Sequence, residues 1–459
     1  FAKFLEYERE PAAIVVGEDM RPSSPLLADA FSDGVISQGM DVIRIGLAST
    51  DMLYFASGKL NLPGIMFTAS HNPAKYNGMK LCKSGARPIG QETGLVKIRQ
   101  LIEQGVPISN RPVGSMRNQE LLTEYVDYLL SLFPDKAFKK RKLKVVIDAG
   151  NGMAGFTAPA VMERLNIDLI PMYFELDGNF PNHEANPIEA KNLKDLQKRV
   201  KKEKADIGLA FDGDADRCFL INEKGELVNP SALTSLIAVH QLKTKPGSTI
   251  IYNLISSKAV SEVIAENGGI GVRSRVGHSY IKSLMAESGA IFGGEHSGHF
   301  YFSNFWRADS GMLAALYALT ELMATKNTLS ELLKPFNRYV ASGEINSKVK
   351  DAEKDLPEGA STPYVNDEFG DVAVITMALT SDGFGMNDMH DMAKHIRDII
   401  YSVKGIKKID LFGVQEERIY LKIESTKLAE LGINRFGTRG IVLGVGSPII
   451  SVNRPIMLW

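Results

Sequence analysis

Short apolar runs rich in β-branched residues alternate with amphipathic stretches, and this alternation limits the folds open to the chain more than any other feature. The runs lie at residues 13–16, 41–45, 144–147, 168–172, 207–210 and 249–252. Helical spacing is found between them at 193–204 and 310–323, and turn-forming residues separate elements at 21–23 and 177–181. Strands that alternate with helices predict an α/β fold of βαβ units with parallel or mixed sheets.

The length and composition allow several such units. The 459 residues, 44% of them hydrophobic, are enough for three or four domains of roughly 100 to 200 residues, each with its own core. A net charge of −1 argues against a nucleic-acid-binding protein, which needs a strongly basic face. Cys82 and Cys218 are too few for a disulfide framework. Because neither a long apolar run nor a basic-then-apolar amino terminus is seen, we expect a cytoplasmic protein with no membrane contact.

Charged or Pro/Gly-rich stretches interrupt the pattern near residues 122, 228 and 350, where we expect domain limits. At the amino terminus, Phe1, Phe4 and Leu5 already have helical spacing and no Met precedes them, so we expect the chain to begin within a helix. The stretch 352–433 has a different order: a strand, a helix, two strands and a second helix, at 372–379, 387–403, 408–412, 418–423 and after Ser425. This order predicts a ferredoxin-like α+β module, and the tail 434–459 is left unassigned.

A serine follows the apolar run 64–67, in the segment Thr68-Ala-Ser-His-Asn-Pro73. Because His71 and a turn-forming Asn-Pro come next, the hydroxyl of Ser70 is presented on a loop. The carboxyl ends of parallel strands are where ligands bind. Taken alone, the segment also fits a capped turn without a chemical role.

Three aspartates stand at alternate positions in Phe211-Asp-Gly-Asp-Ala-Asp-Arg217. The carboxylates of Asp212, Asp214 and Asp216 repel one another on a tight turn unless a cation is present, and Mg²⁺ or Ca²⁺ prefers such oxygen ligands. An EF-hand is rejected because Arg217 stands where that loop requires Gly and because the flanks have strand patterns. Arg217 is instead a candidate contact for an anionic substrate or phosphate.

A third polar segment, Gly294-Glu-His-Ser-Gly-His299, follows the run 290–292. Its Glu, Ser and His side chains could hydrogen-bond several hydroxyls at once, as a sugar requires. A zinc site lacks a cysteine or third ligand, while an ordinary polar loop remains an alternative. The segment Gly277-His-Ser-Tyr-Ile-Lys282 adds His278 at the start of a helix, as a candidate acid, base or phosphate contact.

The order and spacing of these segments resemble the α-D-phosphohexomutase superfamily, and most closely its bacterial phosphomannomutase/phosphoglucomutase branch, over about residues 1–350. The regions that carry the resemblance are residues 68–73 with Tyr76-Asn-Gly-Met-Lys80, residues 212–217, Gly277-His278, and residues 294–299. The resemblance implies three similar βαβ-type, mixed-sheet domains around a cleft, which we place at 1–122, 123–228 and 229–350. It also implies an isomerase that works by intramolecular phosphotransfer.

For the reacting centre, the resemblance implies that Ser70 carries a phosphoryl group and gives it to a hexose phosphate. The product is a bisphosphate intermediate, and a hexose 1,6-bisphosphate would act as activator. Mg²⁺ would be held by the Ser70 phosphate and by Asp212, Asp214 and Asp216. His71, next to the nucleophile, is counted among the candidate catalytic residues.

For the substrate, the resemblance places Lys80, Arg217 and His278 around the reacting phosphate and hydroxyl. A hydroxyl nucleophile needs a base, and the choice between Lys80 and His278 is left open. The candidate contacts to sugar hydroxyls lie together in one segment: Glu295 and Ser297, with His299 near them.

Two motifs of the family are not found in the sequence. One is an amino-terminal Tyr-Asp-x-Arg-Gly motif with an active-site arginine, and the other is a fourth-domain loop, Arg-x-Ser-Asn/Gly-Thr-x-Pro, which grips the distal phosphate. Arg435-Phe-Gly-Thr-Arg-Gly440 lacks the serine of that loop. In its place, residues 352–433 resemble the periplasmic porter region of resistance-nodulation-division efflux transporters, without the membrane helices that transport requires. A chimeric gene or assembly is our hypothesis, with a true fusion as the alternative.

We therefore predict a phosphohexomutase that acts on mannose or glucose phosphates. Phosphoglucosamine mutase is the alternative within enzymes. A catalytically impaired sugar-phosphate-binding protein is the alternative outside them, because two elements that grip the substrate are missing. The expected partners are small hexose phosphates, and no nucleic acid or membrane.

Overall fold

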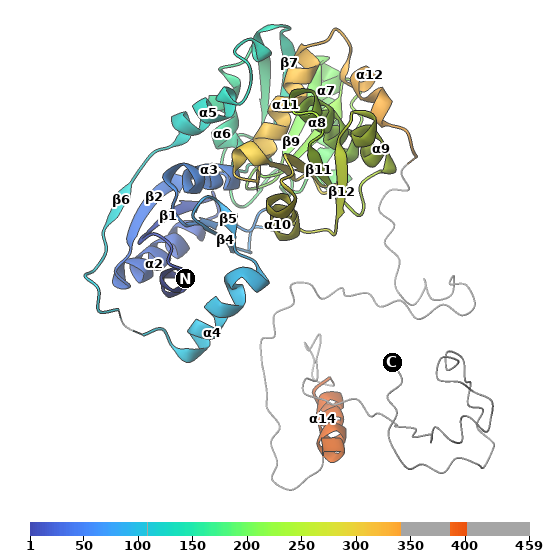
Figure 1. Cartoon of the computed structure of the whole chain (residues 1–459). Helices are drawn as coiled ribbons and strands as arrows, with labels where there is room; N and C mark the ends of the chain where they lie inside the picture. The colour runs from blue at the N-terminus through green and yellow to red at the C-terminus, as the bar shows by residue number, and fades with distance from the viewer. Residues whose placement is uncertain (108, 341–385, 402–459) are drawn as a thin grey trace, which may run out of the picture. The chain divides into compact units, whose positions relative to one another are not determined.

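The structure is a computed structural model that describes residues 1–107, 109–340 and 386–401. The chain divides into two compact units, residues 1–345 and 346–459. The first contains three mixed sheets in chain order, which Figure 1 shows in blue, in teal to green, and in yellow-green. In the second unit, the described element is helix α14 (Met386–Tyr401).

The first sheet has the order β5-β4-β3-β1-β2-β6. Its strands are β1 (Ala13–Glu18), β2 (Asp41–Leu47), β3 (Gly64–Phe67), β4 (Met79–Lys83), β5 (Arg87–Pro88) and β6 (Met116–Asn118). The helices are α1 (Ala2–Tyr7), α2 (Ser24–Ser37), α3 (Thr50–Leu60), the short η1 (Gln91–Leu95) and α4 (Val96–Gln104). Val15 packs into one hydrophobic cluster and Ile14 and Val16 into another, because successive side chains of a strand point to opposite faces.

The second sheet has the order β10-β9-β7-β8, and all neighbours are parallel except β9 and β10. Its strands are β7 (Leu143–Asp148), β8 (Ile167–Met172), β9 (Ile207–Phe211) and β10 (Cys218–Asn222). The helices are α5 (Leu122–Ser131), η2 (Ala137–Lys139), α6 (Ala154–Met162), η3 (Ala190–Leu193) and α7 (Lys194–Glu203). Strands β9 and β10 are antiparallel because residues 212–217 form a tight turn between them.

The third sheet has the order β12-β11-β13-β14-β15, parallel over its first three strands and antiparallel beyond. Its strands are β11 (Thr249–Asn253), β12 (Ile270–Ser274), β13 (Phe292–Gly294), β14 (Phe300–Phe302) and β15 (Ala308–Asp309). The helices are α8 (Pro230–Thr244), α9 (Lys258–Glu266), α10 (His278–Ser288), η4 (Ser303–Phe305), α11 (Gly311–Met323), α12 (Leu329–Leu333) and η5 (Lys334–Phe336).

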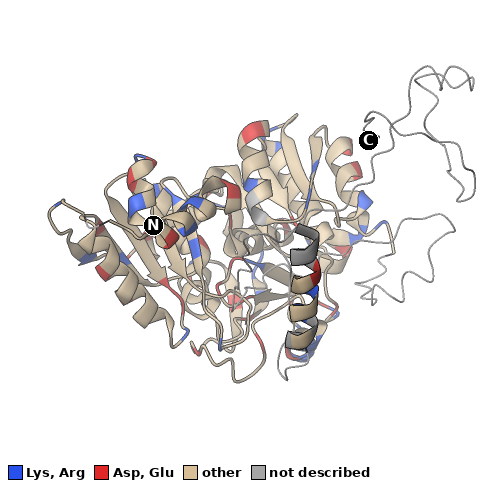
Figure 2. Cartoon of the chain, turned by 90° about the horizontal axis from the view of Figure 1, so that it is seen from below, with Lys and Arg blue, Asp and Glu red and all other residues tan. Residues whose placement is uncertain are grey.

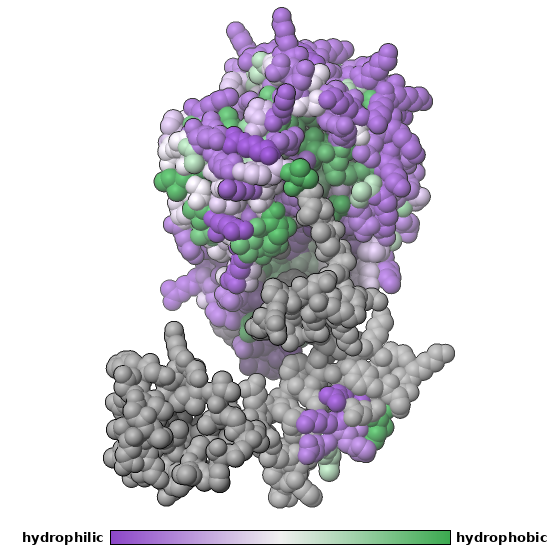
Figure 3. Space-filling model, turned by 90° about the vertical axis from the view of Figure 1, so that its right-hand side faces the viewer, coloured by the Kyte–Doolittle hydropathy of each residue, from purple (hydrophilic) through white to green (hydrophobic). Residues whose placement is uncertain are grey.

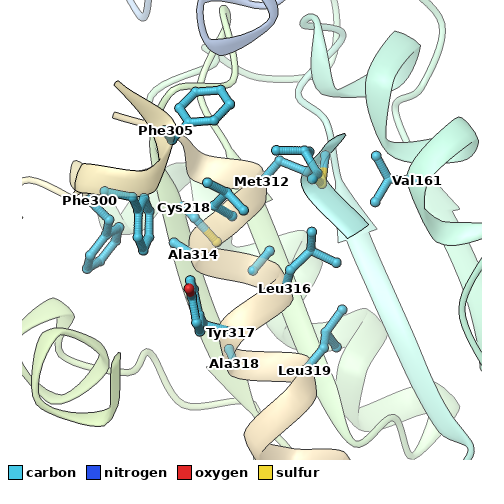
Figure 4. Packing of buried hydrophobic residues seen from close by; sticks show 14 of the residues in the cluster. Val161, Cys218, Phe300, Phe305, Met312, Ala314, Leu316, Tyr317, Ala318 and Leu319 are labelled. Atoms are coloured by element: carbon cyan, nitrogen blue, oxygen red, sulfur yellow. The ribbon is translucent and has the colours of Figure 1, made fainter. Parts of the chain in front are cut away.

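The largest hydrophobic cluster contains side chains from all three sheets, including Val15, Val145 and Ile250. Helix α11 lies at its centre, and Figure 4 shows Leu316 and neighbouring side chains of this helix packed with residues of the second and third sheets. The apolar residues that give 310–323 its helical spacing are all buried, as expected for core packing: Met312, Leu313, Leu316, Leu319 and Met323. A core shared by the three sheets fixes the loops at their edges relative to one another.

The predicted α/β class is confirmed, and the six predicted apolar runs all lie within strands. The helices expected at the amino terminus, at 193–204 and at 310–323 are α1, α7 and α11. In the porter-like stretch, the helix predicted at 387–403 is α14. The remaining elements predicted there and the tail 434–459 lie outside the described residues, and the domain limits stay predictions.

The described surface carries both signs of charge. Figure 2 shows basic and acidic residues interspersed along the described helices and strands, in agreement with the net charge of −1. Figure 3 shows one face on which hydrophilic residues predominate, with apolar patches between them. A helix long and apolar enough to cross a membrane is not found in the described part of the chain.

Candidate active site

The candidate site is built from loops that follow the carboxyl ends of parallel strands in two different sheets, the edge at which such sheets bind ligands. Residues 68–78, here called the serine loop, connect β3 to β4. Residues 212–217, called the aspartate loop, connect β9 to β10. The two loops touch: a Cβ added to Gly213 would lie 2.4 Å from the carbonyl oxygen of Ser70. The serine and the three aspartates, 142 or more residues apart in sequence, are therefore neighbours.

Ser70 is half-buried and has a left-handed backbone, with φ of 50°. This conformation costs a residue other than glycine about 1–3 kcal/mol, so the surroundings must hold it. The Ser70 amide donates to Thr68 Oγ1 at 2.9 Å, and the Ser70 hydroxyl donates to Asp212 Oδ2 at 2.9 Å. The Nδ1 atom of His71 lies 3.4 Å from the same hydroxyl. The serine loop thus directs the Ser70 oxygen to the first carboxylate.

The carboxylates of Asp212, Asp214 and Asp216 are fully buried, and one oxygen of each lies within 4.8 Å of the others. The Oδ1 atoms of Asp214 and Asp216 make no hydrogen bond among the described residues. Buried polar atoms without a partner are rare in folded proteins. Because the donors are hard oxygens beside a serine hydroxyl, the cluster fits a divalent cation such as Mg²⁺.

Crowding of the three carboxylates changes their proton affinities. Burial, together with the charges of Asp216 and Asp214, raises the pKa of Asp212 to about 8. Burial alone would also raise the pKa of Asp214, but Lys80 and hydrogen bonds to this carboxylate lower it to about 2. Without a bound cation, the crowded cluster therefore binds a proton more readily than separate aspartates would.

The side-chain ammonium group of Lys80 lies between Asp214 and Asp216. Its Nζ is 2.6 Å from Asp214 Oδ2 and 2.5 Å from Asp216 Oδ2. Burial disfavours the ammonium, but the two carboxylates outweigh it and raise the pKa of Lys80 well above its ordinary value. Thr50, at the start of α3, donates from its hydroxyl to Asp214 Oδ2 and from its amide to Asp214 O. Because these donors use Oδ2, the Oδ1 atoms of Asp214 and Asp216 stay open.

Arg217 and His299 join the aspartate loop to the third sheet. The Arg217 amide donates to Asp212 Oδ1 at 3.1 Å, and its Nε lies 3.4 Å from Asp212 Oδ2. His299 pairs with Arg217 in a β-bridge, and its Nδ1 lies 2.9 Å from Asp309 Oδ2 and 3.7 Å from Asp216 Oδ1. These contacts bring the segment 294–299 to the edge of the aspartate cluster.

Glu295 is buried directly after β13 and already has three donors, one of them Asn253 Nδ2 at 3.5 Å from Oε1. The Tyr301 hydroxyl donates to its Oε2 at 2.7 Å, and the Gly277 amide donates to its Oε1 at 3.2 Å. Glu295 thus ties the turn after β13 to the turn before α10. Ser297 is half-buried in the same turn. His278 is the first residue of α10, and its side chain lies outside the described residues.

The structure therefore brings together Ser70, His71, Lys80, Arg217 and the three aspartates, and it connects His299 to them. Burial, with a smaller contribution from Arg217, lowers the pKa of His71 to about 4, so His71 is neutral at pH 7. Glu295 and Ser297 precede His299 by four and two residues in the segment 294–299.

Sequence reasoning missed several residues that hold this site, among them Arg21, Thr50 and the buried pair of Lys282 and Asp309. The Nζ of Lys282 lies 2.6 Å from Asp309 Oδ1, and Asp309 in turn holds His299. Lys282 was named only as part of a helical segment. Arg21, a charged residue three positions after the end of β1, is an available signal, but sequence analysis predicts only a turn there.

Family models match the three sheets in order. The models described as phosphoglucomutase/phosphomannomutase, alpha/beta/alpha domains I, II and III match residues 1–107, 123–225 and 229–339. A model of the AcrB/AcrD/AcrF family matches residues 334–435, which covers the porter-like stretch.

Similarity to individual proteins supports the matches to domains I, II and III. A phosphomannomutase of Vibrio cholerae is 38% identical over 398 residues, 84% of this chain and 85% of the relative. A phosphomannomutase of Escherichia coli strain K12 is 40% identical over 359 residues, 76% and 77% of the two chains. The crystal structure of a phosphoglucomutase/phosphomannomutase family protein from Burkholderia thailandensis superposes with a TM-score of 0.69 at 32% identity, over 74% of each chain.

Proposed function

The chain belongs to the phosphohexomutase superfamily, and from this premise we propose that it interconverts the 1- and 6-phosphates of mannose and glucose through a phosphoserine at position 70. The observation that carries the proposal is the position of the Ser70 hydroxyl, 2.9 Å from Asp212 Oδ2. Beside it stand two buried carboxylates, of Asp214 and Asp216, whose Oδ1 atoms lack donors. A nucleophilic hydroxyl at an open carboxylate cluster is what metal-assisted phosphoryl transfer needs.

In the proposed reaction, the phosphoryl group on Ser70 passes to the free hydroxyl of a hexose phosphate. The bond from phosphorus to Ser70 Oγ breaks, a bond to the sugar oxygen forms, and the sugar hydroxyl loses its proton to a base. The bisphosphate then turns over and returns its other phosphoryl group to Ser70. Ser70 and the three aspartates would hold Mg²⁺, which when bound neutralises charge on the transferred phosphoryl group.

The residues around Ser70 have different roles in the proposed reaction. Lys80 is held as an ammonium by Asp214 and Asp216, so we assign it to charge stabilisation rather than to proton removal. Of the two bases considered from the sequence, this leaves His278. Neutral His71, 3.4 Å from the Ser70 hydroxyl, is placed to hydrogen-bond the serine oxygen.

The sugar would lie against the turn after β13, with its hydroxyls bound by Glu295 and Ser297 and by His299 beside them. His299 Nδ1 lies 2.9 Å from Asp309 Oδ2, so a protonated His299 would form an ion pair with this carboxylate. Arg217, next to both segments, is the proposed contact for substrate phosphate. We place the activity in the cytoplasm, in agreement with two buried, unpaired cysteines.

A coupled mutase assay tests the proposal. Purified chain receives glucose 1-phosphate or mannose 1-phosphate with Mg²⁺ and a trace of hexose 1,6-bisphosphate. We expect turnover that Ser70→Ala abolishes and that Ser261→Ala, a matched change on the exposed face of α9, leaves intact. Turnover of glucosamine phosphate alone would instead support a phosphoglucosamine mutase. Saturable binding of sugar phosphate without turnover would contradict the proposal and support a binding protein.

A further inference from the structure

Arg21 is the largest side chain of the described residues that is completely buried, and it follows the carboxyl end of β1. Its Nε donates to Asp19 Oδ2 at 3.1 Å, and its own amide donates to Asp19 Oδ1 at 3.0 Å. Ser24 donates to the same Asp19 oxygen at 2.6 Å. The ring of Phe180 covers the guanidinium at 5.1 Å. The buried charge is therefore paired and fixed in orientation.

The rest of the guanidinium is bound to the main chain of the serine loop. Nη1 donates to the carbonyl oxygens of Pro73 and Tyr76, at 3.0 Å each. Nη2 donates to the carbonyl oxygens of Ser70 at 2.9 Å and Asn72 at 2.7 Å. The loop lies between β3 and β4 without regular structure, so its carbonyl groups need donors from elsewhere. One side chain supplies four of them.

We propose that Arg21 is a positioning residue for phosphoryl transfer, which holds the serine loop so that the Ser70 hydroxyl stays directed at Asp212. The inference rests on the proposed function for its kinetic consequence. Its structural basis is independent: the left-handed backbone of Ser70 needs support, and Arg21 binds the carbonyl of that residue. Arg21 does not contact the Ser70 hydroxyl and therefore acts through the main chain.

A lysine at position 21 could not make the same set of hydrogen bonds. A guanidinium offers five donors in a rigid plane, whereas an ammonium offers three donors around one point. The second sheet also contributes, because the turn of residues 177–180 packs directly on Arg21. A Cβ added to Gly178 would lie 2.5 Å from the Arg21 Cα. Arg21 is thus enclosed between the serine loop and the turn of residues 177–180, for which sequence analysis predicted no role beyond a turn.

The test compares Arg21→Lys with Arg44→Lys in the coupled assay. Arg44 belongs to the same sheet, and its guanidinium is paired with Glu18 and Asp29 rather than with the carbonyl groups of the serine loop. For Arg21→Lys we expect kcat to fall about 100-fold, as misplacement by about 1 Å can do, with KM changed by less than about threefold. Arg44→Lys should keep the wild-type kcat. In Arg21→Ala, added guanidinium ion should restore part of the lost kcat.

A second measurement does not depend on activity. Hydrogen exchange of the peptide that contains residues 70–76 should be at least about tenfold faster in Arg21→Lys than in wild type or Arg44→Lys. Where the Arg21 variants do not fold, Asp19→Asn, which loosens the same guanidinium, takes their place in both measurements. Wild-type kcat with unchanged exchange would overturn the inference, and so would a raised KM at unchanged kcat. Absence of turnover in the wild type would refute the proposed function, and exchange would still decide the role of Arg21.

Discussion

The serine loop and the aspartate loop meet at Ser70, but they are held in opposite ways. The serine loop has its carbonyl groups bound by a single buried cation, Arg21, which the chain itself supplies. The aspartate loop gathers three buried carboxylates and leaves two of their oxygens without a donor. The first loop thus has a donor for four of its carbonyl groups, whereas the second keeps two carboxylate oxygens open, which a bound cation would fill.

The two loops therefore differ in what they contribute: the serine loop fixes the position of Ser70, and the aspartate loop supplies negative charge. Lys80 and Arg217 face three carboxylates, and burial together with the charges of Asp216 and Asp214 raises the pKa of Asp212. A bound divalent cation would offset this crowding. On the proposed function, the serine loop would keep the Ser70 hydroxyl in place while the charge at the aspartate loop changes. Substitutions in the two loops should therefore affect activity and stability in different ways.

The largest effect is expected for Asp214→Asn. Loss of one metal ligand should lower turnover by on the order of 10² to 10³-fold and remove the rise in melting temperature that Mg²⁺ gives to the wild type. Asp195→Asn, on the exposed face of α7, serves as the matched control and should change neither quantity. Melting curves with and without Mg²⁺, together with kcat, make the measurement. A variant that Mg²⁺ still stabilises like the wild type would contradict the assigned metal site.

Gly213→Ala should break the contact between the two loops. The added methyl group would lie 2.4 Å from the Ser70 carbonyl oxygen, so the loops must separate. We expect a loss of about 1–3 kcal/mol in the free energy of unfolding, as for other overpacked sites, and a lower kcat. Gly34→Ala is the control, because its Cβ in α2 meets nothing within 4 Å and should stabilise the helix by about 0.5–1 kcal/mol. Equal stability of the two variants would refute the close contact.

A smaller effect is expected at Asp51, next to the Thr50 that binds the aspartate loop. Asp51 is buried, accepts hydrogen bonds from Tyr125 at 2.8 Å and Ser310 at 2.6 Å, and has its pKa raised by burial to about 6. Because the folded-state pKa exceeds the ordinary value of 3.8, the protonated carboxyl favours the folded state below pH 4 and this contribution is lost as pH rises through 6.

Asp51→Asn imitates the protonated carboxyl and should remove this pH dependence. The difference in unfolding free energy between variant and wild type should shift by about 2–3 kcal/mol in favour of the variant from pH 4 to pH 7. Denaturant unfolding at several pH values measures it. A difference that stays constant with pH would show that Asp51 does not titrate in this range.

The sequence predicted what depends on local pattern. The apolar runs became β1, β2, β7, β8, β9 and β11, because buried parallel strands such as β1, β7 and β9 select such residues; β8, at the edge of its sheet, is only partly buried. Ser70 and the three aspartates were recognised because each follows such a run. The supports of these residues were missed, since they come from distant segments: Arg21 lies 49 residues from Ser70, and Thr50 lies 164 residues from Asp214. Only the order of strands and the packing of sheets bring them together.

The most direct test of the account is the identity of the residue that carries phosphate. The purified chain is incubated with hexose 1,6-bisphosphate, with and without Mg²⁺, and its peptides are analysed by mass spectrometry. The account predicts phosphate on Ser70, formed with Mg²⁺ and absent from Asp214→Asn treated in the same way. Phosphate at another residue, or equal labelling of a Ser70→Ala chain, would contradict it.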